Sequence, residues 1–436
     1  MGAVSRGIDR MAVTFDEDHL VANAGLLLVA TLARRLGIGA LVDAMVKIPA
    51  KRGGFLPGRK VLTLVHAMVA GATHIDHADL LRAGATGQAL GHAVMAPSTL
   101  GTFLRGFTFG HLRQLDKVLG EVLRRAWSFM ALPERLVVDI DSTICEVTGK
   151  KKAGAAYGYT KVLGYHPLLA TRADTGEVLH ARMRKGSANT QRGTKRFVEE
   201  LVARLRRAGA TGEITMRFDS GFWSTATIGD LERLKIHYTL GVRMVKPLVR
   251  LVEELPEESW RPVADYPVGG EAQVAECSYL GRRTIVRRTR TLDRHQQLFA
   301  TWQHFGFVTD LTADALAVDA FHRAHATVEL DIRDLKEGAG LEHCPSGNFS
   351  ANGAWLLCTV LAHNLLRWTQ ILGGIGDPAD ARPAIARTVR TRLISMPGQL
   401  VNRSGTPTLR TPSRWPWQST FTNALDTLRA LPIAVT

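Results

Sequence analysis

Three acidic residues, Asp141, Asp219 and Glu329, are the side chains whose type and spacing point most directly to chemistry. The first two end short apolar runs, which is the pattern of buried strands with polar residues at their tips. Three converging carboxylates repel one another unless a hard cation lies between them. Oxygen ligands suit Mg²⁺, with Mn²⁺ able to substitute, and two such ions can hold the attacking and leaving oxygens of a phosphodiester. The sequence therefore predicts a metal site on these three residues.

The elements that must position these acids follow the order three strands, helix, strand, helix, strand. The expected strands cover 135–141, 162–172, 177–184, 213–219 and 236–242, and the clearest helices cover 190–208 and 321–336. The turn Asp174-Thr175-Gly176 indicates that the first three strands form an antiparallel meander. If the first and fourth strands are neighbours, their tips bring Asp141 and Asp219 side by side, and a helix across the sheet offers Glu329 to the same point.

The sequence on either side of these elements has a different character. Apolar spacing predicts an all-helical region before residue 130, with helices over 25–36, 61–72, 99–107 and 112–127. The short helix that opens at Pro97 is either the second helix of a helix-turn-helix or a plain packing helix. Alternation within 245–310 predicts a β-rich insertion, and 355–371 predicts a helix that packs on the sheet. The tail after Gly373 is basic and expected to be extended or partly helical.

Composition narrows the possible partners. The 436 residues are long enough for two to three domains, and Lys plus Arg exceed Asp plus Glu by 55 − 40 = 15, with a pI near 10.0. Such a surface attracts polyanions, so nucleic acid is the first partner to consider. Four cysteines without a CxxC pair exclude a zinc ribbon and favour a reducing cytoplasm. The apolar run 25–33 is too short to span a bilayer, so no membrane association is expected.

Three motifs surround the acids in a recognisable order: Asp141-Ser142-Thr143, the segment Arg217-Phe-Asp-Ser-Gly-Phe222, and the helix 321–336. With these motifs the sequence resembles insertion-sequence DDE transposases, in which a β insertion interrupts an RNase H-like catalytic domain between the second Asp and the Glu. The resemblance implies an α/β fold with an RNase H-like mixed sheet flanked by helices. The expected domains are a helical DNA-binding region (1–130), a catalytic domain (131–244 plus 311–372), a β-rich insertion (245–310) and a basic C-terminal region (373–436).

The function implied by the resemblance is DNA transposition by a two-metal mechanism. Asp141, Asp219 and Glu329 would hold Mg²⁺, a phosphodiester at a transposon end would be hydrolysed, and the freed 3′-OH would attack target DNA. The expected partners are double-stranded DNA, as terminal inverted repeats and target, and a second copy of the chain in a synaptic homodimer. The expected compartment is the bacterial cytoplasm, in association with the nucleoid.

The family often carries a Tyr, Arg, Glu, Lys signature on its third motif. Glu329 and Lys336 fit that register, whereas His322 stands in the place of the Tyr and His325 in the place of the Arg. Other family-like segments are 155–161, 164–167, 185–189 and 345–349. The DNA contacts predicted from the resemblance and from the local charge are Lys336, His325, His322, Arg323, Arg333, Lys185, Arg192 and Arg287.

Arginines are concentrated in the expected insertion. Residues 282–294 contain six Arg and one Asp, which favours contacts with phosphate over a neutralised surface.

Three alternatives remain open at this point. Asp139 lies two residues before Asp141, on the same strand face, and could be the metal ligand instead. The stretch Asp139-Ile-Asp141-Ser-Thr143 also resembles the opening of haloacid dehalogenase-type phosphatases, in which the first Asp is a nucleophile, although the acidic pair that this family needs downstream is missing. His322 and His325 allow a third interpretation, a transposase-derived DNA-binding protein without catalysis.

Overall fold

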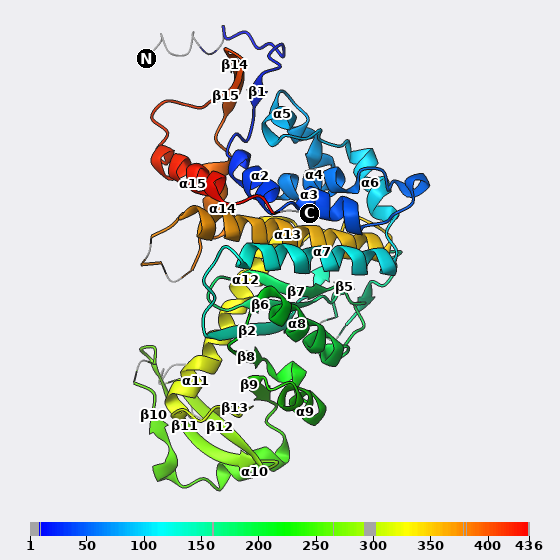
Figure 1. Cartoon of the computed structure of the whole chain (residues 1–436). Coiled ribbons are helices and arrows are strands. Elements are labelled where there is room, and N and C mark those ends of the chain that lie inside the picture. Colours follow the sequence, from blue (N-terminus) through cyan, green and yellow to red (C-terminus); the bar gives the residue numbers. More distant parts are fainter. Residues whose placement is uncertain are drawn as a thin grey trace.

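The computed structural model describes residues 8, 10–158, 161–264, 266–291, 302–377, 379–380 and 382–434. A large mixed sheet lies in the lower half of Figure 1, helices cover it, and a helical region formed mainly by the N-terminal third of the chain lies above. The mixed sheet flanked by helices and the helical N-terminal region agree with the predicted fold class.

The central sheet has nine strands in the order β10-β11-β12-β13-β9-β8-β2-β6-β7. Their bounds are β2 (Arg135–Ser142), β6 (Leu168–Arg172), β7 (Val178–Arg182), β8 (Glu213–Phe218), β9 (His237–Val242), β10 (Arg261–Pro262), β11 (Gly270–Tyr279), β12 (Arg282–Thr291) and β13 (Gln303–Thr309). β2 runs parallel to β8, and β8 runs parallel to β9, whereas the other pairs are antiparallel. The predicted meander and the predicted neighbourhood of the first and fourth strands are both confirmed.

The strand predicted over 162–172 is two strands. β5 (Leu163–Tyr165) belongs to a small three-stranded sheet with β3 (Cys145–Glu146) and β4 (Ala156–Tyr157), and only β6 joins the central sheet. The break falls at His166-Pro167, because proline cannot donate to a ladder. The ring of His166 is held instead, with Nε2 2.9 Å from Ser142 Oγ and Nδ1 donating to Ala188 O.

The strands of the segment 245–310 extend the central sheet. β13 pairs antiparallel with β9, so one continuous hydrogen-bonded sheet extends from β7 to β10. Helix α10 (Lys246–Glu253) precedes these strands, and α9 (Thr225–Arg233) and α8 (Thr194–Ala208) connect the strands before them. The predicted β-rich character is therefore present.

Helix α13 (Phe349–Gly373) joins the two halves of the molecule. It is buried along nearly its whole length, and it contacts α4 and α7 of the helical region as well as β7 and α12. Figure 1 shows it lying beside α7 between the upper helices and the sheet. Its polar residues are paired: the Asn364 amide accepts from Val178 N and donates to Val178 O, at 2.7 and 2.8 Å.

The other helices of the upper region are α2 (Leu26–Arg35), α3 (Ile38–Met45), α4 (Pro57–Val69), α5 (Thr86–Leu90), α6 (Pro97–Arg105) and α7 (Phe109–Trp127). Each of the four helices expected here is present, whereas α3 and α5 are additional. β1 (Leu20–Val21) pairs with β14 from the C-terminal region.

The tail is more ordered than its composition indicated. It forms α14 (Ala386–Val389), a π-helical turn (Arg390–Ile394), a hairpin of β14 (Gly398–Arg403) and β15 (Thr406–Arg410), and α15 (Gln418–Ala430). Helix α15 packs on α2 and α13 because Phe421, Ala424, Leu425 and Leu428 form a buried stripe at helical spacing. Within the described part of the chain, no helix is long and apolar enough to cross a bilayer.

Candidate active site

Asp141 and Asp219 lie at the ends of neighbouring parallel strands. In the ladder between β2 and β8, Asp139 is opposite Arg217 and Ile140 is opposite Phe218. Asp141 and Asp219 each come one residue further along, so the two carboxylates occupy equivalent places at one sheet edge. Asp219 also begins the turn after β8, where its Oδ1 accepts a hydrogen bond from Gly221 N at 3.1 Å.

A buried ion pair lies directly behind these acids. The Arg217 guanidinium donates to both oxygens of Asp139, at 2.6 and 2.7 Å, and neither side chain is more than 3% exposed. His325 Nδ1 lies 2.8 Å from Asp139 Oδ1. Both carboxylate oxygens of Asp139 are therefore engaged within the protein, which supports Asp141 over Asp139 as a ligand and leaves no free nucleophile for the phosphatase alternative.

Arg217 also contacts the helix that precedes Glu329, the third candidate acid. Its Nη1 donates to Phe321 O at 2.7 Å, and its guanidinium lies over the Phe321 ring, 5.0 Å from the centroid. Phe321 belongs to α11 (Ala315–Arg323), the helix that leads toward Glu329. A single side chain thus joins the strands of Asp141 and Asp219 to the helical segment that carries the third acid.

The helix predicted over 321–336 is two helices. α11 ends at Arg323, a 3₁₀ turn covers Ala324–Ala326, and α12 (Thr327–Ala339) follows with Glu329 in its first turn. The prediction of one continuous helix was wrong at this turn. His325 lies within the turn, where its ring bonds to Asp139, and the Thr327 hydroxyl donates to Ala324 O.

Burial raises the pKa of both acids at the strand ends. The pKa of Asp141 rises to about 6, and the charges of Asp219 and Glu329 add to the effect of burial, against the Ser142 N–H and His325. Burial also raises the pKa of Asp219, although the backbone N–H groups after it and the charges of His325 and Arg243 oppose the change. A cation bound beside these carboxylates would favour their ionised forms.

The donor set fits a hard divalent cation. All three candidate ligands offer carboxylate oxygens, and Glu329 is exposed at the start of α12. A bound Mg²⁺ would supply positive charge beside Asp141. Among the causes that raise the pKa of Asp141 are the charges of Asp219 and Glu329, so both acids lie within electrostatic range of Asp141.

The ligand atoms of Asp141, Asp219 and Glu329 do not all lie within 4.8 Å of one another, whereas those of another cluster do. Within the described residues, only Asp116, His180 and Glu200 have ligand atoms that all lie within 4.8 Å of one another. Arginines already occupy these carboxylates: Arg204 lies 2.6 Å from Asp116, and Arg113 lies 2.8 Å from Glu200. Burial opposes ionisation, but these cations and His180 hold the pKa of both acids below the ordinary values. The cluster is an ion-pair network that joins α7, β7 and α8, and no local pattern in the sequence indicates it.

Three of the residues predicted to contact DNA are engaged within the protein on the third motif, and one of them is His325, which bonds to Asp139. His322 Nδ1 lies 2.8 Å from Thr239 Oγ1, its ring stacks on Phe307, and burial lowers its pKa to about 3. Lys336 is half-buried, and its Nζ donates to Ile144 O at 2.8 Å. Lys336 therefore connects α12 to the segment directly after Asp141.

The other predicted contacts differ in accessibility. Lys185, Arg192 and Arg333 are exposed, and Arg323 is exposed while pairing with Asp319 at 3.0 Å. Arg287 is buried and pairs with the same Asp319 at 2.9 Å.

The remaining insertion arginines also meet acids. Arg282 pairs with Glu232, Arg283 with Glu276, Arg288 with Glu257, and Arg290 with Glu271. The interpretation of this segment as an unneutralised basic surface was wrong for these described residues, because their acidic partners come from β11 and from elements outside the arginine run. Residue 294, which completes the run, lies outside the described residues.

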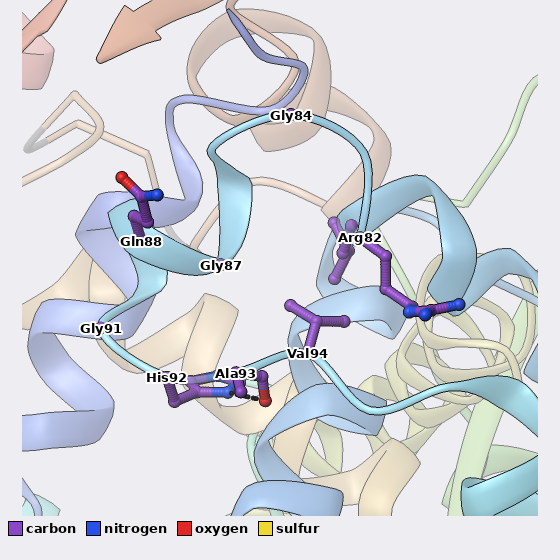
Figure 2. A pocket seen from close by; sticks show the side chains of 9 residues that line it. Arg82, Gly84, Gly87, Gln88, Gly91, His92, Ala93 and Val94 are labelled. Atoms are coloured by element: carbon purple, nitrogen blue, oxygen red, sulfur yellow. Dashed lines mark hydrogen bonds between the residues drawn. The ribbon is translucent and has the colours of Figure 1, made fainter. Parts of the chain in front are cut away.

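A pocket of about 420 Å³ lies elsewhere, in the helical N-terminal region (Figure 2). It is lined by Leu81, Arg82, Gly84, Gly87, Gln88, Gly91, His92, Ala93 and Val94. His92 Nδ1 donates to Ala93 O at 3.1 Å, as Figure 2 shows, and Arg82 pairs with Asp79 outside the lining. None of the three candidate acids lines this pocket, so it is separate from the site at the sheet edge.

The mixed sheet flanked by helices, with Asp141 and Asp219 at the ends of adjacent strands, agrees with the DDE class of transposases that the sequence resembles. A family model described as "Transposase DDE domain group 1" matches residues 5–433, and the chain belongs to that family. Among solved structures, the chain is similar to a piggyBac transposase in a synaptic complex with hairpin DNA. The two are 14% identical with a TM-score of 0.44, over 86% of this chain and 80% of that chain. No curated protein matches the sequence.

Proposed function

We propose that this chain is an active DNA transposase that cleaves phosphodiesters at transposon ends and joins the 3′-OH to target DNA. The observation that carries the proposal is the placement of Asp141 and Asp219 on adjacent parallel strands, with Glu329 close enough to influence the pKa of Asp141. Family membership supports the same reaction class.

Each acid has a distinct support in this proposal. Asp141 and Asp219 are fixed by the β2–β8 ladder and by the buried Arg217–Asp139 pair behind it, whereas Glu329 is fixed by α12. These three side chains would hold Mg²⁺, or Mn²⁺ in its place. When bound, the metal supplies charge stabilisation at the attacking and leaving oxygens. No covalent bond between protein and DNA is needed.

The DNA-binding surface in this proposal is the exposed cationic set near the sheet edge. Lys185 and Arg192 lie on the loop that leads into α8. Arg323 lies on α11, and Arg333 lies on α12, the helix that also carries Glu329. Contacts of these side chains with phosphates would position double-stranded transposon ends and target DNA. A second copy of the chain would hold the other end in the synaptic complex.

The test is metal-dependent breakage of DNA at the element's own ends. A plasmid with the sequences that flank the gene is incubated with the protein in Mg²⁺, Mn²⁺ or EDTA. We expect breaks at the ends with either metal and none with EDTA. Asp219→Ala should reduce cleavage by at least 10³-fold, because a ligand oxygen is lost, while binding of the ends changes less than about threefold.

The control is Asp426→Ala, which removes an exposed acid on α15 and should cleave normally. Equal cleavage by the Asp219→Ala variant and the wild type would refute the catalytic assignment. Binding without breaks in the wild type, under every metal condition, would support the inactive DNA-binding alternative instead. That alternative draws on His322 and His325, which contact Thr239 and Asp139 inside the protein.

A further inference from the structure

The small sheet beside Asp141 carries an exposed surface that the proposed mechanism does not use. Its exposed cations and aromatic ring are Lys150, Lys151, Tyr157, Lys161 and Lys185, which we call the small-sheet surface, and the exposed acid Glu146 lies on β3 of the same sheet. Tyr157 is 62% exposed on β4.

Positive charge dominates the sequence on both sides of this sheet. No Asp or Glu occurs between Glu146 and Asp174, or between Glu177 and Glu199. The described arginines of β12, by contrast, each have an acidic partner. A run of cations without acids is complementary to a polyanion.

The small sheet is attached directly to the catalytic strand. β3 begins at Cys145, four residues after Asp141, and Thr143 N donates to Pro167 O at 3.1 Å. The hydrogen bond between Ser142 and His166 holds the same junction. A ligand on the small sheet would therefore be fixed relative to Asp141.

Lys185 is brought to the sheet by close backbone packing. Tyr165 forms an isolated bridge with Lys185, and Gly186 N donates to Gly154 O at 3.0 Å. A Cβ on Gly186 would lie 2.3 Å from Ala156 O, so only glycine fits between the loop and β4. The position of Lys185 beside Tyr157 is thus set by the fold.

We propose that the small-sheet surface binds an unpaired DNA strand next to the cleavage point, with Tyr157 stacked on a base and the lysines contacting phosphates. The ring favours this ligand because base faces are accessible in unpaired strands and covered by neighbours in a duplex. Contacts between lysines and phosphates alone would not distinguish single-stranded from double-stranded DNA. The inference rests on the proposed function and adds the form of DNA that the site receives.

The test compares two probes with the full-length protein, in EDTA to prevent cleavage. One probe is a blunt duplex of the element's end, and the other is the same duplex with a six-nucleotide 3′ single-stranded tail. We expect Tyr157→Ala to weaken binding of the tailed probe by about 10- to 100-fold, the range for loss of one base–aromatic stack, and of the blunt probe by less than about twofold.

The matched control is Phe305→Ala, which removes an aromatic ring of similar exposure (55%) on β13. It should leave both affinities unchanged. Lys151→Ala should lower the slope of log affinity against log salt on the tailed probe by about 0.7, the value for one single-strand phosphate contact, whereas Arg207→Ala should not.

Two results would overturn the inference while leaving the proposed function intact. Tyr157→Ala could behave like Phe305→Ala on the tailed probe, or it could weaken both probes equally, which would indicate a duplex contact. A wild type that binds neither probe would refute this inference and the proposed function together.

Discussion

Replacement of Arg217 by methionine should loosen the two strands that carry Asp141 and Asp219. The variant leaves Asp139 buried with His325 as its remaining partner, and it also removes the bond to Phe321 O. Loss of one partner from a buried ion pair costs about 3–5 kcal/mol, and the lower end applies here because His325 stays. We expect a loss of about 3 kcal/mol in local stability.

Hydrogen exchange measured by mass spectrometry reports this loss where it occurs. A change of about 3 kcal/mol corresponds to roughly 100-fold faster exchange in peptides that cover β2 and β8. The chain offers a matched control, because Arg135 pairs with Glu213 at 3.1 Å across the same two strands, with both side chains more than half exposed. Arg135→Met should cost at most about 1 kcal/mol, or about fivefold in exchange rate.

A double variant isolates the pair itself. Asp139→Leu combined with Arg217→Met removes both buried charges, so it should exchange more slowly than Arg217→Met alone. Equal exchange rates in Arg217→Met and Arg135→Met would refute the reasoning, since they would show that burial adds nothing to the pair.

Two further predictions follow from the site and its surroundings. The pKa of Asp141 in the folded chain, about 6, lies above the ordinary value of 3.8, so its ionisation destabilises the metal-free protein as pH rises through that interval. Asp141→Asn should therefore stabilise the metal-free protein at pH 8 by at most about 3 kcal/mol in the free energy of unfolding, which a higher melting temperature would report, and should leave the stability unchanged near pH 3.5. An equal gain at both pH values would contradict this cause. The Arg184 guanidinium donates hydrogen bonds to the carbonyls of His166, Asn189, Thr190 and Arg192. Arg184→Met should therefore accelerate proteolysis of the loop 185–192 more than tenfold. An unchanged rate would show that the loop is held by other contacts.

The sequence predicted the succession of strands and helices over residues 135–242, because the relevant signals are local. Apolar runs, the turn at 174–176 and the acids at strand ends each fall within about ten residues. The break at Pro167 was also visible in the sequence, since proline interrupts a ladder, but the continuous apolar run outweighed it.

The support for the acids was harder to predict because it depends on contacts between distant segments. Asp139 and Arg217 each stand two residues before a candidate ligand, and a parallel register that aligns the two motifs places them opposite each other. Their matching positions in the two motifs were the feature of the sequence from which this ion pair could have been predicted. The partner of His325 could not be predicted, because 186 residues separate it from Asp139.

The charge of the insertion shows the limit of counting residues in a window. Arg282, Arg287 and Arg288 pair with acids 50, 32 and 31 residues away, which no local count includes. The folded surface is therefore less basic at β12 than the sequence of this strand indicates.

The continuity of the sheet from β9 into β13 limits how this chain could be shortened. Along the part of β9 paired with β13, residues 239–242 bond to residues 306–309, so removal of 245–310 would expose those backbone groups as a new edge. Exposed, flat edges pair with other chains and lead to aggregation. A minimal catalytic fragment made by excising this segment should therefore be insoluble unless the new edge is capped by a substitute strand.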